Sequence, residues 1–130
     1  MKSEYLWDTN TVIYFLQRQF PLLAEQKIDT ILAVNKPDIS VITEIELLSW
    51  RLAAEDDINT INIFLSGSQI HQLDNDVKLQ TIEIRKQTRL KLPDAIIAGT
   101  AIVYNKTLIT RNTADFKKIP NLKTLDLFEA

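Results

Sequence analysis

Residues 93–104 read PDAIIAGTAIVY, and this stretch decides the class of fold. Proline is well tolerated at the start of a helix, so Pro93 predicts a helix that continues through 94–104. Residues 95–103 are apolar at nearly every position, which leaves no polar face for water. We therefore expect this helix to lie at the centre of the domain, covered on all sides.

Short apolar runs that suit β-strands alternate with helical segments on either side of this helix. The predicted strands span 5–7, 38–41, 69–73, 108–110 and 123–127, and the further helices span 11–19, 22–34, 43–54, 59–65, 75–89 and 113–118. Strands separated by helices predict a parallel sheet covered on both faces. The sequence thus predicts an α/β fold of three layers, α/β/α, with a central, mainly parallel sheet. No linker or repeat interrupts it, so residues 1–130 form a single predicted domain.

The composition is that of an ordinary globular protein and excludes several classes of site. Hydrophobic residues make up 45% and charged residues 25% of the 130 residues, and cysteine is absent. Disulfides, thiolate nucleophiles and cysteine-bound metals are therefore excluded. No apolar run reaches the roughly 20 residues that span a bilayer, and the first residues do not resemble a signal peptide. We expect a cytoplasmic protein without membrane contact.

Four acidic residues are predicted to meet at one edge of the sheet. Asp8 and Asp115 follow predicted strands, while Glu46 and Asp94 lie in the first turns of predicted helices. In a parallel sheet, strand ends and the starts of the following helices share one edge. Carboxylates gathered there repel one another unless a cation lies among them, and oxygen ligands favour Mg²⁺ or Mn²⁺. Such an ion suits phosphoryl chemistry. Because bound cations neutralise phosphates locally, the net charge of −2 does not exclude a nucleic-acid substrate.

Each acid by itself also has a purely structural interpretation. Asp8 is well placed to cap a helix, and Glu46 has capping-box spacing with Thr43. Asp94 suits the positive end of a helix dipole, and Asp115 suits a solvated first turn. Only the joint placement of the four favours a metal site.

Glu44 competes with Glu46 for a place in this site. The two lie two residues apart and so point about 200° apart on a helix, which prevents both from facing the site. Glu46 is the better candidate because it falls one turn into the helix.

The four acids lie in four motifs: LWDTNTVI at 6–13, SVITEIEL at 40–47, LPDAIIA at 92–98 and LITRNTADF at 108–116. Each motif is weak alone, but together, in this order and over nearly the whole chain, they resemble the motifs of PIN-domain nucleases. Two positions depart from the family pattern. Trp50 stands where a small residue is common, and Ala98-Gly99 replaces the usual pair of alanines.

The resemblance implies an endoribonuclease that depends on Mg²⁺ or Mn²⁺. Small single-domain members are mostly VapC-type toxins of type II toxin–antitoxin pairs, which usually form homodimers and are held inactive by a small antitoxin. The family pattern implies that the first three acids surround the metal ion and that Asp115 completes the site directly or through water. Thr110 and Asn112 would position Asp115, water or phosphate, although a strand residue and a helix cap explain them equally well. The implied reaction is in-line attack by a water that the metal activates, without a covalent intermediate.

Two further features have both a functional and a structural interpretation. His71, the only histidine, is more typical of a surface or core residue than of a catalyst. The stretch RKQTRLK at 85–91 is the densest basic segment. It is either a solvated helix end or a guide that leads phosphates toward Asp94.

Other functions fit the sequence less well. The chain contains neither a Walker loop nor a GxGxxG motif, which excludes nucleotide binding by those routes. A magnesium-dependent phosphatase or phosphotransferase is disfavoured because Asp8-Thr9-Asn10 lacks a second acid two residues after the first. A catalytically silent interaction module is disfavoured because all four acids are present.

Overall fold

The computed structural model describes residues 4–51 and 54–129. Its centre is a five-stranded sheet in the order β3-β2-β1-β4-β5, in which every neighbouring pair is parallel. The strands are β1 (Tyr5–Trp7), β2 (Asp38–Ser40), β3 (Gln69–His71), β4 (Thr107–Ile109) and β5 (Thr124–Leu125). The predicted parallel sheet is confirmed.

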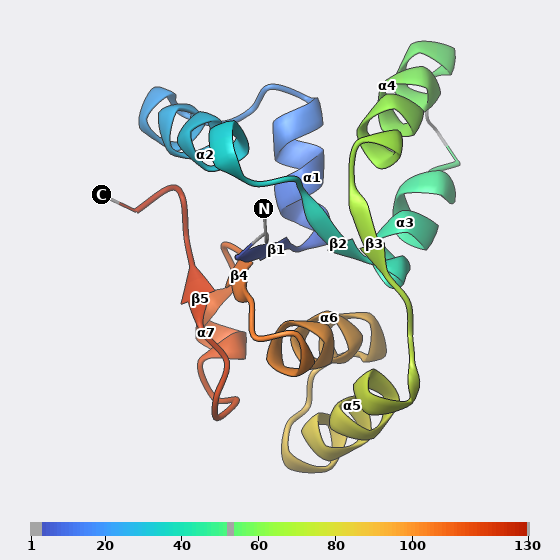
Figure 1. Cartoon of the computed structure of the whole chain (residues 1–130), viewed down its shortest axis with the longest axis vertical. Coiled ribbons are helices and arrows are strands. Elements are labelled where there is room, and N and C mark those ends of the chain that lie inside the picture. Colours follow the sequence, from blue (N-terminus) through green and yellow to red (C-terminus); the bar gives the residue numbers. More distant parts are fainter. Residues whose placement is uncertain (1–3, 52–53, 130) are drawn as a thin grey trace.

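Helices cover both faces of this sheet, as the sequence predicts. Helices α1 and α2 lie on one side and α5 and α6 on the other (Figure 1). The helices are α1 (Thr9–Leu16), α2 (Leu22–Val34), α3 (Val41–Leu48), α4 (Glu55–Ser66), α5 (Asn75–Gln87), α6 (Leu92–Val103) and α7 (Thr113–Phe116). The α/β/α architecture is therefore confirmed. No helix in the described part of the chain has both the length and the apolar character needed to cross a membrane.

Alternating side chains on β1 and β4 build one core on each face. Leu6 and Leu108 are paired in register and belong to the core beneath α5, α6 and α7. Trp7 and Ile109 are paired one position later and belong to the core beneath α1, α2 and α4. All four side chains are at most 1% exposed. Strands buried on both faces need apolar residues at successive positions, which explains their uninterrupted hydrophobic runs.

Helix α6 is the central helix that its apolar sequence predicts. Every residue from 95 to 101 is buried, and the helix packs closely along α5. At Gly99 an added Cβ would lie 2.8 Å from Thr81 Oγ1 and 3.4 Å from the backbone oxygen of Val77. The Thr81 hydroxyl is itself held by a 2.7 Å hydrogen bond to that oxygen. Glycine in place of the usual alanine therefore lets α5 and α6 approach each other.

Several predicted boundaries are wrong, most clearly at the start of α3. The helix begins at Val41 because Ser40 caps it, its Oγ accepting the Ile42 N–H at 3.1 Å. The proposed capping box of Thr43 and Glu46 is therefore absent. Thr43 lies inside the helix, fully buried, and its hydroxyl meets Thr9 instead of the helix end.

The neighbouring helix ends also differ from the predicted ones. Helix α3 ends at Leu48, not near residue 54, and residues 52–53 lie outside the described residues. Helix α4 starts at Glu55, four residues earlier than expected, because the Asp57 carboxylate accepts the Ala54 N–H at 3.1 Å. Helix α1 likewise starts at Thr9, directly after its cap.

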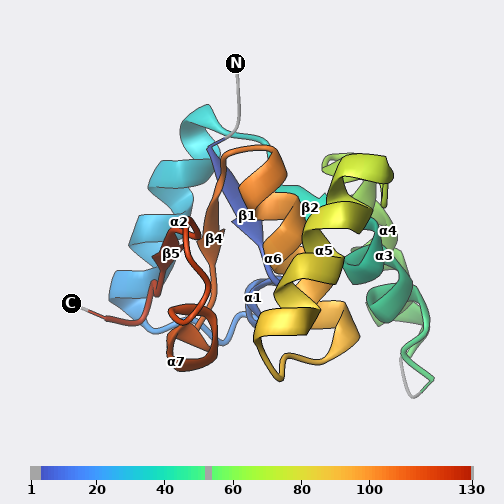
Figure 2. The same ribbon diagram turned by 90° about the horizontal axis from the view of Figure 1, so that it is seen from below.

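The strand order reverses between β1 and β4. The chain continues from β1 outward through β2 and β3, whereas β4 and β5 lie on the other side of β1. The ends of β1 and β4 are tied together, because the Asp8 N–H donates to the Ile109 oxygen at 3.1 Å. Figure 2 shows α1, α7 and the start of α6 gathered at this end of the two strands. Parallel sheets bind ligands at such a reversal.

The close approach of α5 and α6 yields a stability prediction. Gly99→Ala should lower the free energy of unfolding by about 1–3 kcal/mol, because overpacking a buried contact outweighs the roughly 1 kcal/mol that alanine gains in helix propensity. Urea unfolding followed by circular dichroism measures this change.

Gly67→Ala is the matched control. Its nearest neighbour would be 3.8 Å from the new Cβ, so stability should change little. Adding Thr81→Ala to Gly99→Ala removes the clashing hydroxyl and should recover part of the loss. A Gly99→Ala protein as stable as the wild type would contradict the packing argument.

Candidate metal centre and active site

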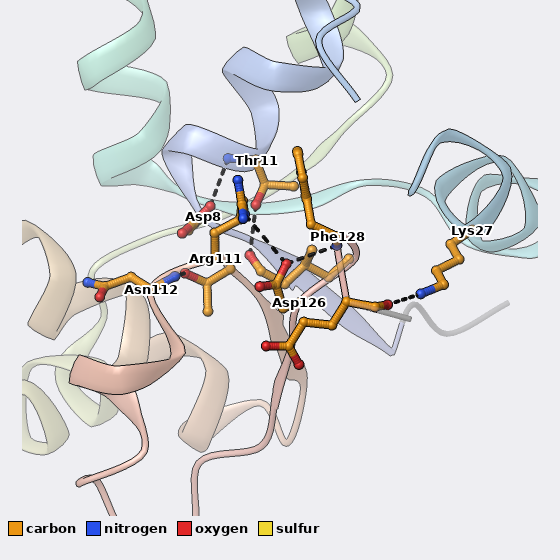
Figure 3. A network of polar contacts seen from close by, with 10 residues as sticks. Asp8, Thr11, Lys27, Arg111, Asn112, Asp126 and Phe128 are labelled. Carbon is orange, nitrogen blue, oxygen red and sulfur yellow. Dashed lines mark hydrogen bonds and ion pairs between the residues drawn. The ribbon is translucent and has the colours of Figure 1, made fainter. Parts of the chain in front are cut away.

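Asp8 links the end of β1 to the start of α1. Its Oδ1 accepts the Thr11 N–H at 2.8 Å, so its structural role as a helix cap is confirmed (Figure 3). The side chain is buried, at 8% exposure. Burial raises the pKa of Asp8, while hydrogen bonds with Thr11 and Thr110 oppose that rise. Capping does not exclude a second role, because Asp8 lies at the strand reversal where the other acids gather.

Thr9, the residue directly after Asp8, holds Glu46 near Asp8. The Thr9 hydroxyl donates to Glu46 Oε1 at 2.7 Å and lies 3.0 Å from the Thr43 hydroxyl. These contacts join α1 to α3 across 37 residues of sequence. Thr9 and Thr43 were not among the predicted site residues, and their spacing along the chain offers no signal for the contact.

Asp94 is the point on which the other three acids converge. It lies half-buried in the first turn of α6. Burial raises its pKa most, and the negative charges of Asp8, Glu46 and Asp115 raise it further, against the opposing charge of Lys91. Glu46, and not Glu44, is among these charges. The acids predicted from four separate motifs thus lie within electrostatic reach of one carboxylate.

Asp115 is held by the segment that leads from β4 into α7. The Asn112 side chain donates from Nδ2 to Asp115 Oδ2 at 3.0 Å, and the Asn112 N–H donates to Thr110 Oγ1 at 3.0 Å. Asn112 occupies the cap position of α7, but its side chain makes no capping hydrogen bond. Thr110 is 1% exposed and hydrogen-bonds with Asp8. This segment therefore connects two of the acids.

Asp126 is a fifth acid that was not predicted. Its charge raises the pKa of Asp8, and its Oδ1 lies 3.8 Å from Arg111 Nε. The Arg111 guanidinium in turn lies 3.9 Å from the centre of the Phe128 ring (Figure 3). Asp126 directly follows β5, just as Asp8 directly follows β1. Asp126 was not predicted as a site residue because the predicted strand, 123–127, included it.

His71 contacts none of the four predicted acids. Its ring centre lies 4.7 Å from that of Tyr104, and its Nε2 lies 3.8 Å from Asp38 Oδ1. The side chain is 8% exposed, which fits the structural interpretation of a core histidine.

A groove of about 710 Å³ opens beside Asp94 and Asp115. Four positively charged side chains also line it: Lys86 near the end of α5, Arg89 and Lys91 in the α5–α6 connection, and Lys118 just after α7. The basic segment predicted at 85–91 therefore borders the acids.

The chemistry of these side chains fits a divalent cation. All four acids supply oxygen, and Asp94 receives no hydrogen bond from the described residues to offset its raised pKa. As the described side chains stand, no three histidine, cysteine or acidic residues are close enough together to hold one ion. Binding would therefore require the exposed carboxylates of Glu46 and Asp115 to turn toward Asp94.

Comparison with known proteins identifies the family. The profile of the PIN domain matches residues 5–122, nearly the whole chain. The chain belongs to the PIN-domain family. This PIN domain is 30% identical to Ribonuclease VapC2 of Rickettsia felis over 126 residues, covering 91% of this chain and 93% of the relative. It is 27% identical to the tRNA(fMet)-specific endonuclease VapC of Salmonella typhimurium, covering 95% and 97%.

A solved structure supports the same assignment. The PIN domain superposes on a chain of VapBC2 from Rickettsia felis bound to a DNA fragment from their promoter, with a TM-score of 0.81 and 28% identity over 96% of this chain and 98% of that one. The predicted family and its fold are confirmed.

The crowding of acids around Asp94 predicts that the stability of the fold decreases when Asp94 loses its proton. A carboxyl whose pKa is raised on folding binds its proton more tightly in the folded state than in the unfolded state. The free energy of unfolding therefore falls as the pH rises from the pKa of an unfolded aspartate, about 3.9, through the pKa of the folded state. With chelator present, Asp94→Asn should therefore unfold at a higher temperature than the wild type at pH 7. The difference should shrink below about pH 4.

Asp29→Asn is the control, since Asp29 is exposed on α2, far along the chain from the four acids. It should leave the midpoint of thermal unfolding unchanged. An Asp94→Asn midpoint at or below that of the wild type at pH 7 would show that the acids do not repel one another appreciably.

Proposed function

We propose that this PIN domain is a metal-dependent endoribonuclease and the toxin of a toxin–antitoxin pair. The observation that carries the proposal is the convergence of Asp8, Glu46 and Asp115 on Asp94 at the strand reversal. Relatives that match nearly the full chain are named ribonuclease and endonuclease. The predicted activity thus agrees with the names of the relatives, whereas the dependence on a metal ion is part of our proposal alone.

Asp8, Glu46 and Asp94 would hold Mg²⁺ or Mn²⁺, with Asp115 completing the site directly or through water. The ion would supply activation of a water and neutralisation of charge on the phosphate. The chain's own polar groups would orient the ligands. Thr9 holds Glu46, and Asn112 holds Asp115. These hydrogen bonds keep Glu46 and Asp115 beside the site, and both carboxylates would still have to turn toward Asp94 to share one ion.

Substitution of the acids tests the proposed activity. Asp8→Asn and Asp94→Asn should each lower the rate of RNA cleavage by more than about a hundredfold, because even outer-shell partners of a metal contribute 10–100-fold. A labelled RNA incubated with purified protein and Mg²⁺ or Mn²⁺ gives the rate, and chelator should stop cleavage by the wild type.

Glu44→Gln is the matched control on the same helix and should cleave normally. Equal cleavage by wild type and Asp94→Asn would mean that the activity comes from a contaminant. A folded wild type that cleaves no RNA with either metal would favour the silent interaction module. Hydrolysis of a phosphate monoester without cleavage of RNA would favour the phosphatase.

A protein partner is the second part of the proposal. The Rickettsia felis structure is of VapBC2, and a small antitoxin is the partner that we propose for this chain. Helices α3 and α4 and the turn after α3 expose large apolar side chains, Ile45, Leu48, Trp50 and Ile58, which are 39–54% exposed. Exposed apolar side chains in such number on neighbouring elements are typical of interaction surfaces.

The proposed assembly is a homodimer that a stoichiometric antitoxin inhibits. Light scattering after gel filtration should give twice the mass of one chain for the isolated protein. Addition of the cognate antitoxin should increase that mass and suppress RNA cleavage in proportion to the amount added. A monomer whose cleavage rate is unchanged by the antitoxin would contradict both parts.

A further inference from the structure

We propose that the connection between α5 and α6, together with Lys118, is a binding track for the phosphates of a single-stranded RNA that leads to the acidic site. This inference rests on the proposed function, because it assigns a path to the substrate of the same site. The groove of about 710 Å³ joins the two regions directly, since Asp94 and Asp115 line it together with the basic side chains.

The cations of the track are available to a ligand. Arg89, Lys91 and Lys118 are exposed, and none of them forms an ion pair with any residue in the described ranges 4–51 and 54–129. Lys86 has only a 3.7 Å contact with Glu83, in which both side chains are more than half exposed. A pair of that kind contributes little and is easily exchanged for phosphate.

This local charge opposes that of the chain as a whole. The protein carries a formal net charge of −2, so long-range attraction does not bring RNA to its surface in general. Neighbouring cations that are exposed and at most weakly paired raise the local positive potential, and a polyanion relieves their repulsion. RNA binding should therefore concentrate at this groove.

The backbone of the track is fixed before any ligand binds. Arg85 donates from Nη1 to the Leu90 oxygen at 2.7 Å, and Leu90 is itself buried at 7% exposure. The Thr88 hydroxyl donates to the Ile84 oxygen at 2.8 Å and accepts the Leu90 N–H at 3.3 Å. Preorganisation of this kind lowers the entropic cost of binding.

The two interpretations of the basic segment therefore apply to different residues. Arg85 lies in the last turn of α5 and is a positioning residue, because its guanidinium holds the Leu90 oxygen. Arg89 and Lys91, which follow it, line the groove.

The lining favours contacts with phosphates over contacts with bases. Among the described residues that line the groove none is aromatic, so the track lacks the stacking platform on which single-stranded bases bind. Lysine and arginine side chains that contact phosphates hold a strand without reading its sequence. The track should therefore contribute affinity and register, and leave the choice of cut site to other groups.

The salt dependence of binding tests the track without requiring cleavage. Full-length Asp94→Asn protein in chelator is titrated into a fluorescein-labelled single-stranded RNA, and anisotropy gives the affinity at several KCl concentrations. Adding Arg89→Gln and Lys91→Gln should weaken binding. It should also reduce the slope of log affinity against log salt by about 1.4, since each lost phosphate contact on a single strand contributes about 0.7.

The matched control removes the same charge elsewhere. Lys78→Gln with Lys117→Gln, on exposed positions outside the groove, should leave the slope unchanged. Two RNAs of different base composition should be affected equally by the groove variant. Thermal unfolding of each variant verifies that it is folded.

Three outcomes would overturn the track. These are a groove variant with the parent slope, a control that lowers the slope as much as the groove variant does, and a loss of affinity confined to one RNA sequence. Gel analysis of the RNA after each titration keeps binding separate from cleavage. If the binding test fails but the wild type still cleaves RNA with Mg²⁺, only the track is rejected. If binding behaves as expected but the wild type does not cleave RNA, only the proposed function is rejected.

Discussion

Mutual repulsion among carboxylates at one edge of the sheet is the constraint on which the rest of this protein depends. Asp94 lies half-buried where the charges of three other acids reach it, and its pKa is raised by burial and by those charges. Hydrogen bonds from neighbouring polar groups hold the other three, whereas Asp94 receives none from the described residues. Such an arrangement lowers stability unless a cation binds, and marginally stable proteins keep such costs mainly where function requires them.

The scaffold keeps the acids together in spite of this repulsion. Asp8 and the segment from Thr110 to Asp115 are carried on β1 and β4, whose paired side chains are buried in two separate cores. Asp94 is carried on α6, which cannot shift easily because Gly99 is in close contact with Thr81 on α5. Packing on both faces of the sheet therefore opposes the separation that electrostatics favours.

On the surface beside the site, a group of basic side chains lies next to the acidic side chains. The groove between the α5–α6 connection and Lys118 carries four cations, of which only Lys86 forms an ion pair within the described residues, and it is also lined by two of the acids. A polyanion held by these cations would place its backbone next to carboxylates that repel it, and a metal ion would weaken that repulsion. Substrate binding and metal binding would thus be coupled through charge, although different residues provide each.

The sequence by itself determined the class of fold and predicted that the four acids lie near one another. Apolar runs alternate with helical segments, and a parallel sheet brings every strand end to one edge, so residues far apart in the chain could be assigned to one place. Periodicity does not specify where an element stops, which is why the start of α3 and the end of β5 were misplaced and Asp126 was missed. Only the tertiary structure decided the contacts between elements. The bond from Thr9 to Glu46 joins residues 37 positions apart. The division of the basic segment into a positioning arginine and three groove-lining cations depends on the turn of the chain at Leu90. Such contacts depend on side-chain direction in the folded chain, which local sequence does not encode.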